Sequence, residues 1–188
     1  ASDVYKRQLL LSRKKLLNRA LKTSSKLESI IEFGANVGLN LIAVKDLIPG
    51  VAATAVEINS SAISKLKMID DVKVIHGSIL ESNKIEMYDL AMVIGVLIHI
   101  APKYLPLAYE NIYRATRRYI LIGEYYSRQP EEVSYRGYKN KLFKRDFAGE
   151  MLDKYTDLRL VDYGFFYHKD ESSQLDDITW FLMEKADI

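Results

Sequence analysis

Cysteine is absent from this chain of 188 residues, so neither a disulfide nor a thiolate metal site can form. A sequence without disulfides is typical of the reducing cytoplasm, which is where we expect this protein to be located. Histidine is scarce as well, and the three histidines at positions 76, 99 and 168 are far apart in the sequence, without ligand pairs. We therefore expect no metal site.

Long apolar runs and a strong charge of either sign are also missing. No run approaches the ~18 residues of a membrane span, and Leu9–Leu11 is too short for a signal-peptide core. The net charge of +2 is too small for a nucleic-acid-binding domain. We expect neither a membrane nor a nucleic-acid partner, and the composition indicates no particular oligomeric state.

What is present suits one soluble globular domain. Hydrophobic residues make up 48% and charged residues 28%, which is enough apolar material for a core in a chain of this length. The chain begins with Ala1 rather than Met, as expected of a fragment or an engineered start. We expect an N-terminal helical segment over residues 1–28 and a single α/β domain over residues 29–188.

The N-terminal segment has leucine and alanine at helical spacing from Leu9 to Leu21, which predicts one amphipathic helix. Its cations fall largely on the other faces, and we expect these faces to be solvated. They are Arg13, Lys14, Lys15, Arg19 and Lys22.

From residue 29 onward, short strands rich in Ile, Val, Leu and Tyr alternate mostly with helical segments, a pattern that predicts a parallel sheet. The expected strands are Ser29–Phe33, Ala52–Glu57, Val72–His76, Tyr88–Ile94 and Arg118–Gly123.

A helix over 145–155 and two further strands complete the pattern, at Leu158–Tyr167 and Asp177–Glu184. The nine residues 168–176 are too few for a parallel crossover, so the last strand should be antiparallel to its neighbour. The predicted fold is a Rossmann-like three-layer α/β sandwich with a seven-stranded, mostly parallel sheet, which is the arrangement of class I methyltransferases.

The turn after the first strand, Glu32–Asn40, carries glycines at 34 and 38 that let a ligand approach the backbone. A dinucleotide-binding GxGxxG motif would need glycines at 36 and 39, where Asn36 and Leu39 stand. The spacing resembles the acidic residue and GxGxG of methyltransferases, with Asn36 at the middle glycine. A plain strand-to-helix turn is the alternative.

The second and third strands also end in residues suited to a nucleoside. Glu57, at the end of the second strand, can accept both hydroxyls of a ribose. Its alternative role is a charge at the start of the next helix, with Asn59 as the cap. Ser78 stands where many methyltransferases place an acidic residue toward adenine, and its hydroxyl can also accept.

Ligands of open parallel sheets bind beyond the carboxyl ends of the strands. These features, together with the GVLIHI segment after the fourth strand, predict a site for S-adenosylmethionine at that edge. The candidate cofactor-binding residues are Glu32, Gly34, Asn36, Gly38, Asn40, Glu57, Ile58, Gly77, Ser78, Ile79 and Gly95.

Longer segments carry a narrower resemblance: IIEFGANVGLNL, VLIHIAP, RYILIGEYY, VSYRGYKNKLFKRDFAGEM, LVDYGFFYHKD and DDITWFLMEK. From about Ile30 to Lys185 the chain resembles the methylases associated with pseudaminic acid biosynthesis, which are bacterial proteins encoded with nonulosonic-sugar pathways. The resemblance implies methyl transfer from S-adenosylmethionine to such a sugar, its nucleotide-linked form or a precursor. Within that family Asn36 and Ser78 are ordinary.

A sulfonium methyl group is already activated, so catalysis needs mainly alignment and a base for the acceptor's proton. His99 and Glu124 follow the fourth and fifth strands and are the candidate catalytic residues. For His99, an ordinary loop or core histidine is the alternative.

After the fifth strand we expect a long loop in which aromatic and basic residues alternate, suited to the apolar face and the anionic groups of a sugar. The candidate acceptor-binding residues are Tyr125, Tyr126, Tyr135, Arg136, Lys141 and Arg145. A solvated basic loop before a helix that Asp146 helps to start is the alternative.

Two other functions remain open. One is a non-catalytic binding subunit that keeps the fold, and the other is an NAD-dependent oxidoreductase, which Asn36 and Leu39 disfavour.

Overall fold

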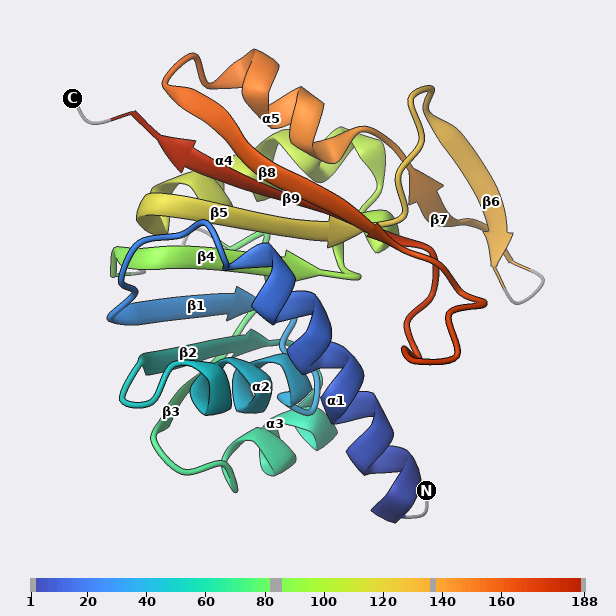
Figure 1. Cartoon of the computed structure of the whole chain (residues 1–188). Helices are drawn as coiled ribbons and strands as arrows, with labels where there is room; N and C mark the ends of the chain where they lie inside the picture. Colours follow the sequence, from blue (N-terminus) through green and yellow to red (C-terminus); the bar gives the residue numbers. More distant parts are fainter. Residues whose placement is uncertain (1–2, 82–85, 136–137, 187–188) are drawn as a thin grey trace.

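The computed structural model describes residues 3–81, 86–135 and 138–186. One seven-stranded sheet has the strand order β3-β2-β1-β4-β5-β9-β8 (Figure 1). Its strands are β1 (Ser29–Phe33), β2 (Ala52–Glu57), β3 (Val72–His76), β4 (Tyr88–Ile94), β5 (Thr116–Glu124), β8 (Leu158–Phe166) and β9 (Ile178–Lys185).

Strands β1 to β5 are parallel where they pair, and β9 is antiparallel to both of its neighbours, β5 and β8. The reversed strand β9 is therefore an interior strand of the sheet. The edge strand β8 runs in the same direction as β5. This topology confirms the predicted class I methyltransferase fold.

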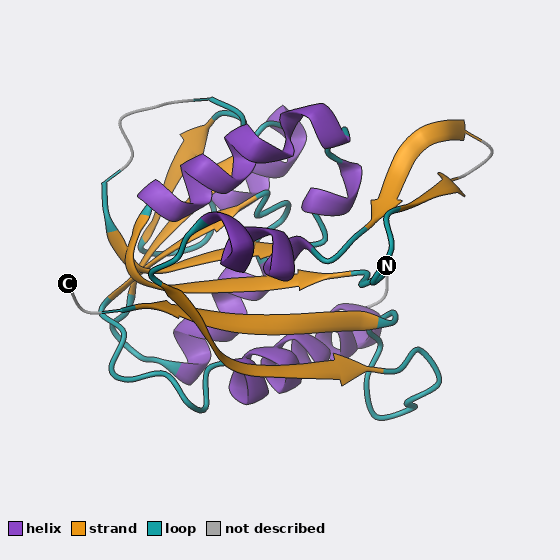
Figure 2. Ribbon diagram, turned by 90° about the horizontal axis from the view of Figure 1, so that it is seen from above, coloured by secondary structure: helices purple, strands orange, loops and turns teal. Residues whose placement is uncertain are grey.

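Helices cover both faces of the sheet (Figure 2). The helices are α1 (Asp3–Ala20), α2 (Leu39–Leu47), α3 (Ser60–Leu66), α4 (Leu105–Arg114) and α5 (Phe147–Lys154), with 3-10 turns η1 (Leu97–His99) and η2 (Pro102–Tyr104). Buried residues of α1 and α2 share one core layer with the sheet, and those of α4 and α5 share the other. The three layers are therefore those expected from the sequence. None of the helices in the described ranges combines the length and the hydropathy needed to cross a bilayer.

The basic face of the N-terminal segment is only partly solvated: Arg19 and Lys22 are exposed, as expected, whereas Lys14 and Lys15 are half-buried. Lys14 pairs with Asp46 at 2.6 Å, and Lys15 pairs with Asp170 at 2.9 Å. Arg19 lies over the ring of Phe166. Because α1 contributes its fully buried Leu16 and Leu17 to the same core, the neighbouring Lys14 and Lys15 reach partners on other elements.

The segment after β5 is a second correction. In place of a long loop, the structure has an antiparallel hairpin of β6 (Glu131–Tyr135) and β7 (Tyr138–Lys144). Leu142 and Phe143 of the hairpin are buried, and Val133 packs against the same core layer. The charged residues around these few apolar positions obscured the strand pattern in the sequence. These few contacts fix the hairpin on the domain.

Candidate cofactor and active site

The turn between β1 and α2 has the backbone conformation that glycine favours. Gly34 has a φ of 71°, and a Cβ there would clash with Val96 Cγ2. Asn36 has a φ of 48°, in the left-handed region that asparagine tolerates better than most residues. The residue at the middle position of the glycine pattern thus keeps the conformation that a glycine would adopt.

Glu57 is almost fully buried and joins this turn to the start of α3. One carboxylate oxygen, Oε2, accepts the backbone N–H of Asn36 at 2.7 Å. The other, Oε1, accepts the N–H groups of Ile58 and Asn59 at 2.9 and 2.8 Å. Asn59 caps α3, as predicted, by accepting from Ser61 and Ala62. Glu57 therefore organises the backbone at the helix start. Oε1 already accepts two donors, whereas Oε2 retains a lone pair for a further donor.

Three cavities follow one another along this edge of the sheet, and Gly34 and His99 line all three. The Arg13 cavity, about 270 Å³, also includes Asn36, Asn40, Gly95, Glu124 and Tyr125. The Glu57 cavity, about 490 Å³, includes Asn36, Glu57, Ile58 and Gly95. The Ser78 cavity, about 180 Å³, includes Glu57, Ile58, Gly77, Ser78 and Ile79.

The cavities thus collect most of the predicted cofactor residues. Gly38, with a φ of 83°, precedes α2 and packs against Ile69 and Leu66, so its role is in the turn. Ser78 Oγ accepts the backbone N–H of Leu80 at 3.1 Å and so shapes the wall of the Ser78 cavity.

Glu32 is fully buried behind Asn40. Its Oε1 accepts a hydrogen bond from Asn40 Nδ2 at 2.6 Å. The second oxygen of Glu32 and Oδ1 of Asn40 have no hydrogen-bond partner among the described residues. Burial raises the pKa of Glu32 to about 8, although the bond from Asn40 and the charge of Arg13 act in the opposite direction. Asn40 lines the Arg13 cavity, whereas Glu32 lines none of the three cavities.

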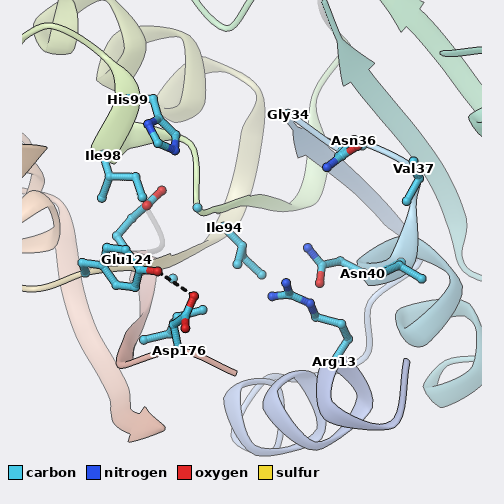
Figure 3. Close-up of a pocket in the computed structure, with 16 residues that line it drawn as sticks. Arg13, Gly34, Asn36, Val37, Asn40, Ile94, Ile98, His99, Glu124 and Asp176 are labelled. Atoms are coloured by element: carbon cyan, nitrogen blue, oxygen red, sulfur yellow. Dashed lines mark hydrogen bonds between the residues drawn. The ribbon is translucent and has the colours of Figure 1, made fainter. Parts of the chain in front are cut away.

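Glu124 lies at the end of β5 and lines the Arg13 cavity (Figure 3). Its Oε1 accepts the backbone N–H groups of Val96 and Leu97 at 2.9 and 2.8 Å, while Oε2 is buried without a described partner. Burial raises the pKa of this carboxyl to about 8 against the effect of these backbone donors. Glu124 therefore fixes the turn after β4 and presents a carboxyl that can hold a proton near neutral pH.

His99, in η1, is exposed at the point where the three cavities meet. An accessible imidazole there can reach a ligand from the solvent side. The structure brings His99 and Glu124, the two candidate bases, to one cavity.

The predicted acceptor-binding residues do not all lie at the cavities. The Tyr125 hydroxyl donates to Asp176 at 2.7 Å in the Arg13 cavity, with Lys144 over its ring. Tyr126 packs on Phe181, and Arg145 pairs with Glu150 at 2.7 Å; neither lines the three cavities. Arg136 and the side chains of Tyr135 and Lys141 lie outside the described residues.

The two charged residues Arg13 and Asp176 of the Arg13 cavity were not among the predicted site residues. Arg13 stands three and four residues before the buried Leu16 and Leu17, so helical periodicity placed it on the inner face of α1. Asp176 lies between β8 and β9, where no sequence pattern distinguished it. Within the described ranges, no group of three His, Cys, Asp or Glu side chains could hold a metal ion.

The strand order, the reversed β9 and the cavities at the carboxyl ends of β1 to β5 define the fold of class I S-adenosylmethionine-dependent methyltransferases. The sequence matches no protein-family model and no curated protein at a significant level.

Solved structures with this fold align over nearly the whole chain. One is the Burkholderia thailandensis 1,6-didemethyltoxoflavin-N1-methyltransferase with bound 1,6-didemethyltoxoflavin and S-adenosylhomocysteine, at 15% identity and a TM-score of 0.73, covering 98% of this chain and 82% of that one. Another is the glycopeptide N-methyltransferase MtfA complexed with S-adenosylhomocysteine, at 11% identity and a TM-score of 0.70, covering 93% and 90%. The O-methyltransferase of a trans-AT PKS multienzyme of Brevibacillus brevis, also with S-adenosylhomocysteine, has 13% identity and a TM-score of 0.73, covering 97% and 74%. At these identities the likeness establishes the fold.

Proposed function

We propose that this protein is a methyltransferase that uses S-adenosylmethionine and methylates a small acceptor, a nonulosonic sugar of the pseudaminic acid type, its nucleotide-linked form or a precursor. The observation that carries the proposal is the row of three cavities that meet at Gly34 and His99. They lie where ligands of open parallel sheets bind, and the solved neighbours named above hold S-adenosylhomocysteine.

Each cavity suits one part of the cofactor. The Ser78 cavity, with Ile79 and Leu80, offers a largely apolar slot for adenine. In the Glu57 cavity, the free lone pair of Glu57 Oε2 can accept a ribose hydroxyl. The Arg13 cavity has the polar groups for an amino-acid end and remains open toward His99 and Tyr125 for an acceptor.

The chemistry requires little from the protein beyond position and a proton acceptor. When bound, S-adenosylmethionine supplies a methyl group on a positively charged sulfur, and transfer leaves the neutral thioether. The walls around Glu124 and His99 align the acceptor atom, and one of these two side chains takes its proton as the new bond to carbon forms. The sugar acceptor rests on the sequence resemblance, and Lys144 over the ring of Tyr125 gives it a suitable cation.

Isothermal titration of the purified protein with S-adenosylhomocysteine and, separately, with NAD tests the cofactor. We expect micromolar binding of S-adenosylhomocysteine, loss of that binding in Glu57→Ala, and no binding of NAD. The exposed carboxylate of Glu28, changed in Glu28→Ala, provides the control. Binding of NAD alone would contradict the proposal and favour an oxidoreductase.

The acceptor is tested by following S-adenosylhomocysteine release with pseudaminic acid, its nucleotide-linked form and its precursors. We expect turnover with at least one of them and a mass increase of one methylene in the product. Tight cofactor binding with no turnover on any sugar would contradict the acceptor class and would favour a non-catalytic subunit or an unrelated acceptor.

A further inference from the structure

Arg13 is the one cation that α1 directs into the row of cavities. It is half-buried, and its guanidinium points to the cavity interior beside the carboxamide of Asn40 (Figure 3). The helix holds it there because Leu16 and Leu17, one turn later on the same face, are fully buried in the core. The direction of the side chain is therefore set by packing.

The charge of Arg13 is only partly compensated. Burial lowers the pKa of its guanidinium, while the fields of Glu32 and Asp176 act to keep it charged. No hydrogen bond or ion pair joins Arg13 to another residue within the described ranges. Lys14, the next residue, shows the contrast, since it pairs with Asp46 at 2.6 Å. A guanidinium directed into a cavity without a carboxylate partner is suited to bind an anion.

The wall of the cavity beside Arg13 is suited to bind a cation instead of an anion. Asn40 Nδ2 donates to Glu32 at 2.6 Å, which leaves Oδ1 as the acceptor on the other side of the carboxamide. Oδ1 and the second oxygen of Glu32 are buried acceptors with no partner among the described residues. An ammonium group of a ligand would supply the donor that Asn40 Oδ1 lacks.

We propose that Arg13 binds the α-carboxylate of the cofactor's amino-acid end and that Asn40 Oδ1 accepts a hydrogen bond from its α-ammonium group. This assignment rests on the proposed function. An α-amino acid carries both charges on one carbon, and Arg13 and Asn40 lie side by side at the end of the site. A carboxylate of an acidic acceptor is the other source of the same chemistry, and the experiment separates the two.

The test compares two ligands in the absence of any acceptor, S-adenosylhomocysteine and its decarboxylated analogue, which keeps the amine. Isothermal titration with the wild type, Arg13→Met, Arg13→Lys and the control Lys14→Met gives the affinities. We expect Arg13→Met to weaken S-adenosylhomocysteine about 10- to 100-fold, as for a lost charge-assisted hydrogen bond, and to leave the decarboxylated analogue unchanged. Arg13→Lys should be intermediate, and Lys14→Met should match the wild type.

Each other result counts against the assignment. Equal weakening of both ligands in Arg13→Met would show that Arg13 acts through the fold, which thermal unfolding of the unliganded variant would reveal. If Arg13→Met bound S-adenosylhomocysteine as tightly as the wild type does, Arg13 would be available for an anion of the acceptor. That result would overturn the assignment and leave the proposed function intact. If neither ligand binds to the wild type, the proposed function fails and the assignment fails with it.

Discussion

The Glu57 carboxylate accepts the backbone N–H of Asn36 at 2.7 Å, and this bond joins the carboxyl ends of β1 and β2. Asn36 itself is in the left-handed region, with a φ of 48°. The conformation of the turn and the position of the carboxylate therefore depend on each other. A change that removes the carboxylate or disfavours the left-handed conformation should affect both the fold and the cofactor site.

Glu57→Gln tests the carboxylate side of this pair. The amide keeps one oxygen but loses the charge and places an NH2 group against backbone donors, so we expect a loss of about 1–3 kcal/mol in the free energy of unfolding. We also expect S-adenosylhomocysteine to bind at least about tenfold more weakly, as one good hydrogen bond is worth about that factor. Urea unfolding and isothermal titration measure the two effects. Glu28→Gln is the matched control, and equal behaviour of the two variants would disprove a role for Glu57.

The backbone side is tested by Asn36→Gly and Asn36→Val. Glycine adopts a positive φ without strain, so Asn36→Gly should retain stability within about 0.5 kcal/mol and retain cofactor affinity. A β-branched residue in the left-handed region costs about 1–2 kcal/mol, and Asn36→Val should lose at least that much. Urea unfolding decides between them, with Ser64→Val on the exposed face of α3 as the control for β-branching. A stable Asn36→Val would contradict the φ argument.

The strands that build the site were predictable because most of them alternate with helices and each carries a run of apolar residues. The bounds of β1 to β4 agree with the expected ranges, and β9 has the predicted reversal. The turn at Gly34 and the carboxylate at Glu57 were predictable for a local reason, since each follows directly on its strand. Asp146 also caps α5 as expected, by accepting from Gly149.

Contacts between residues far apart in the sequence were not predictable. Arg13 and Asp176 meet in one cavity although 163 positions separate them, and only the packing of α1 and the loop before β9 brings them together. The β6–β7 hairpin was missed because lysines and tyrosines surround its few apolar positions. Arg145 was expected to bind the acceptor, but a partner five positions later, Glu150, engages it.

Glu32 and Glu124 should make stability depend on pH. Burial raises the pKa of each from 4.5 to about 8, so between these values the folded state keeps protons that the unfolded chain has lost. Their contribution is fully present below pH 4.5 and is lost as pH rises through about 8. The free energy of unfolding should thus fall with rising pH, by at most about 1.4 kcal/mol per pH unit for each group.

Urea unfolding at pH 5 to 9 measures this slope. Glu32→Gln and Glu124→Gln should each make it shallower, whereas the exposed Glu171→Gln should leave it as in the wild type. A slope that neither buried substitution alters would show that both carboxyls titrate near their ordinary values.

Substitutions of His99 and of Glu124 are expected to affect cofactor binding and turnover differently. His99 is exposed, so His99→Gln should keep S-adenosylhomocysteine affinity within about twofold and lower kcat by about 10² to 10⁴ if His99 takes the acceptor's proton. Glu124 holds the N–H groups of Val96 and Leu97, so Glu124→Gln should disturb the turn and weaken cofactor binding as well.

Titration and the S-adenosylhomocysteine release assay, run on both variants with the sugar that supports turnover, separate the two roles. Lys103→Gln, an exposed change in η2, is the control for altered surface charge near His99. Full kcat in His99→Gln together with a large loss in Glu124→Gln would transfer the proton-accepting role to Glu124. Since the pKa of Glu124 is about 8, kcat in the wild type would then rise as pH increases through that value, because only the ionised carboxyl can take a proton.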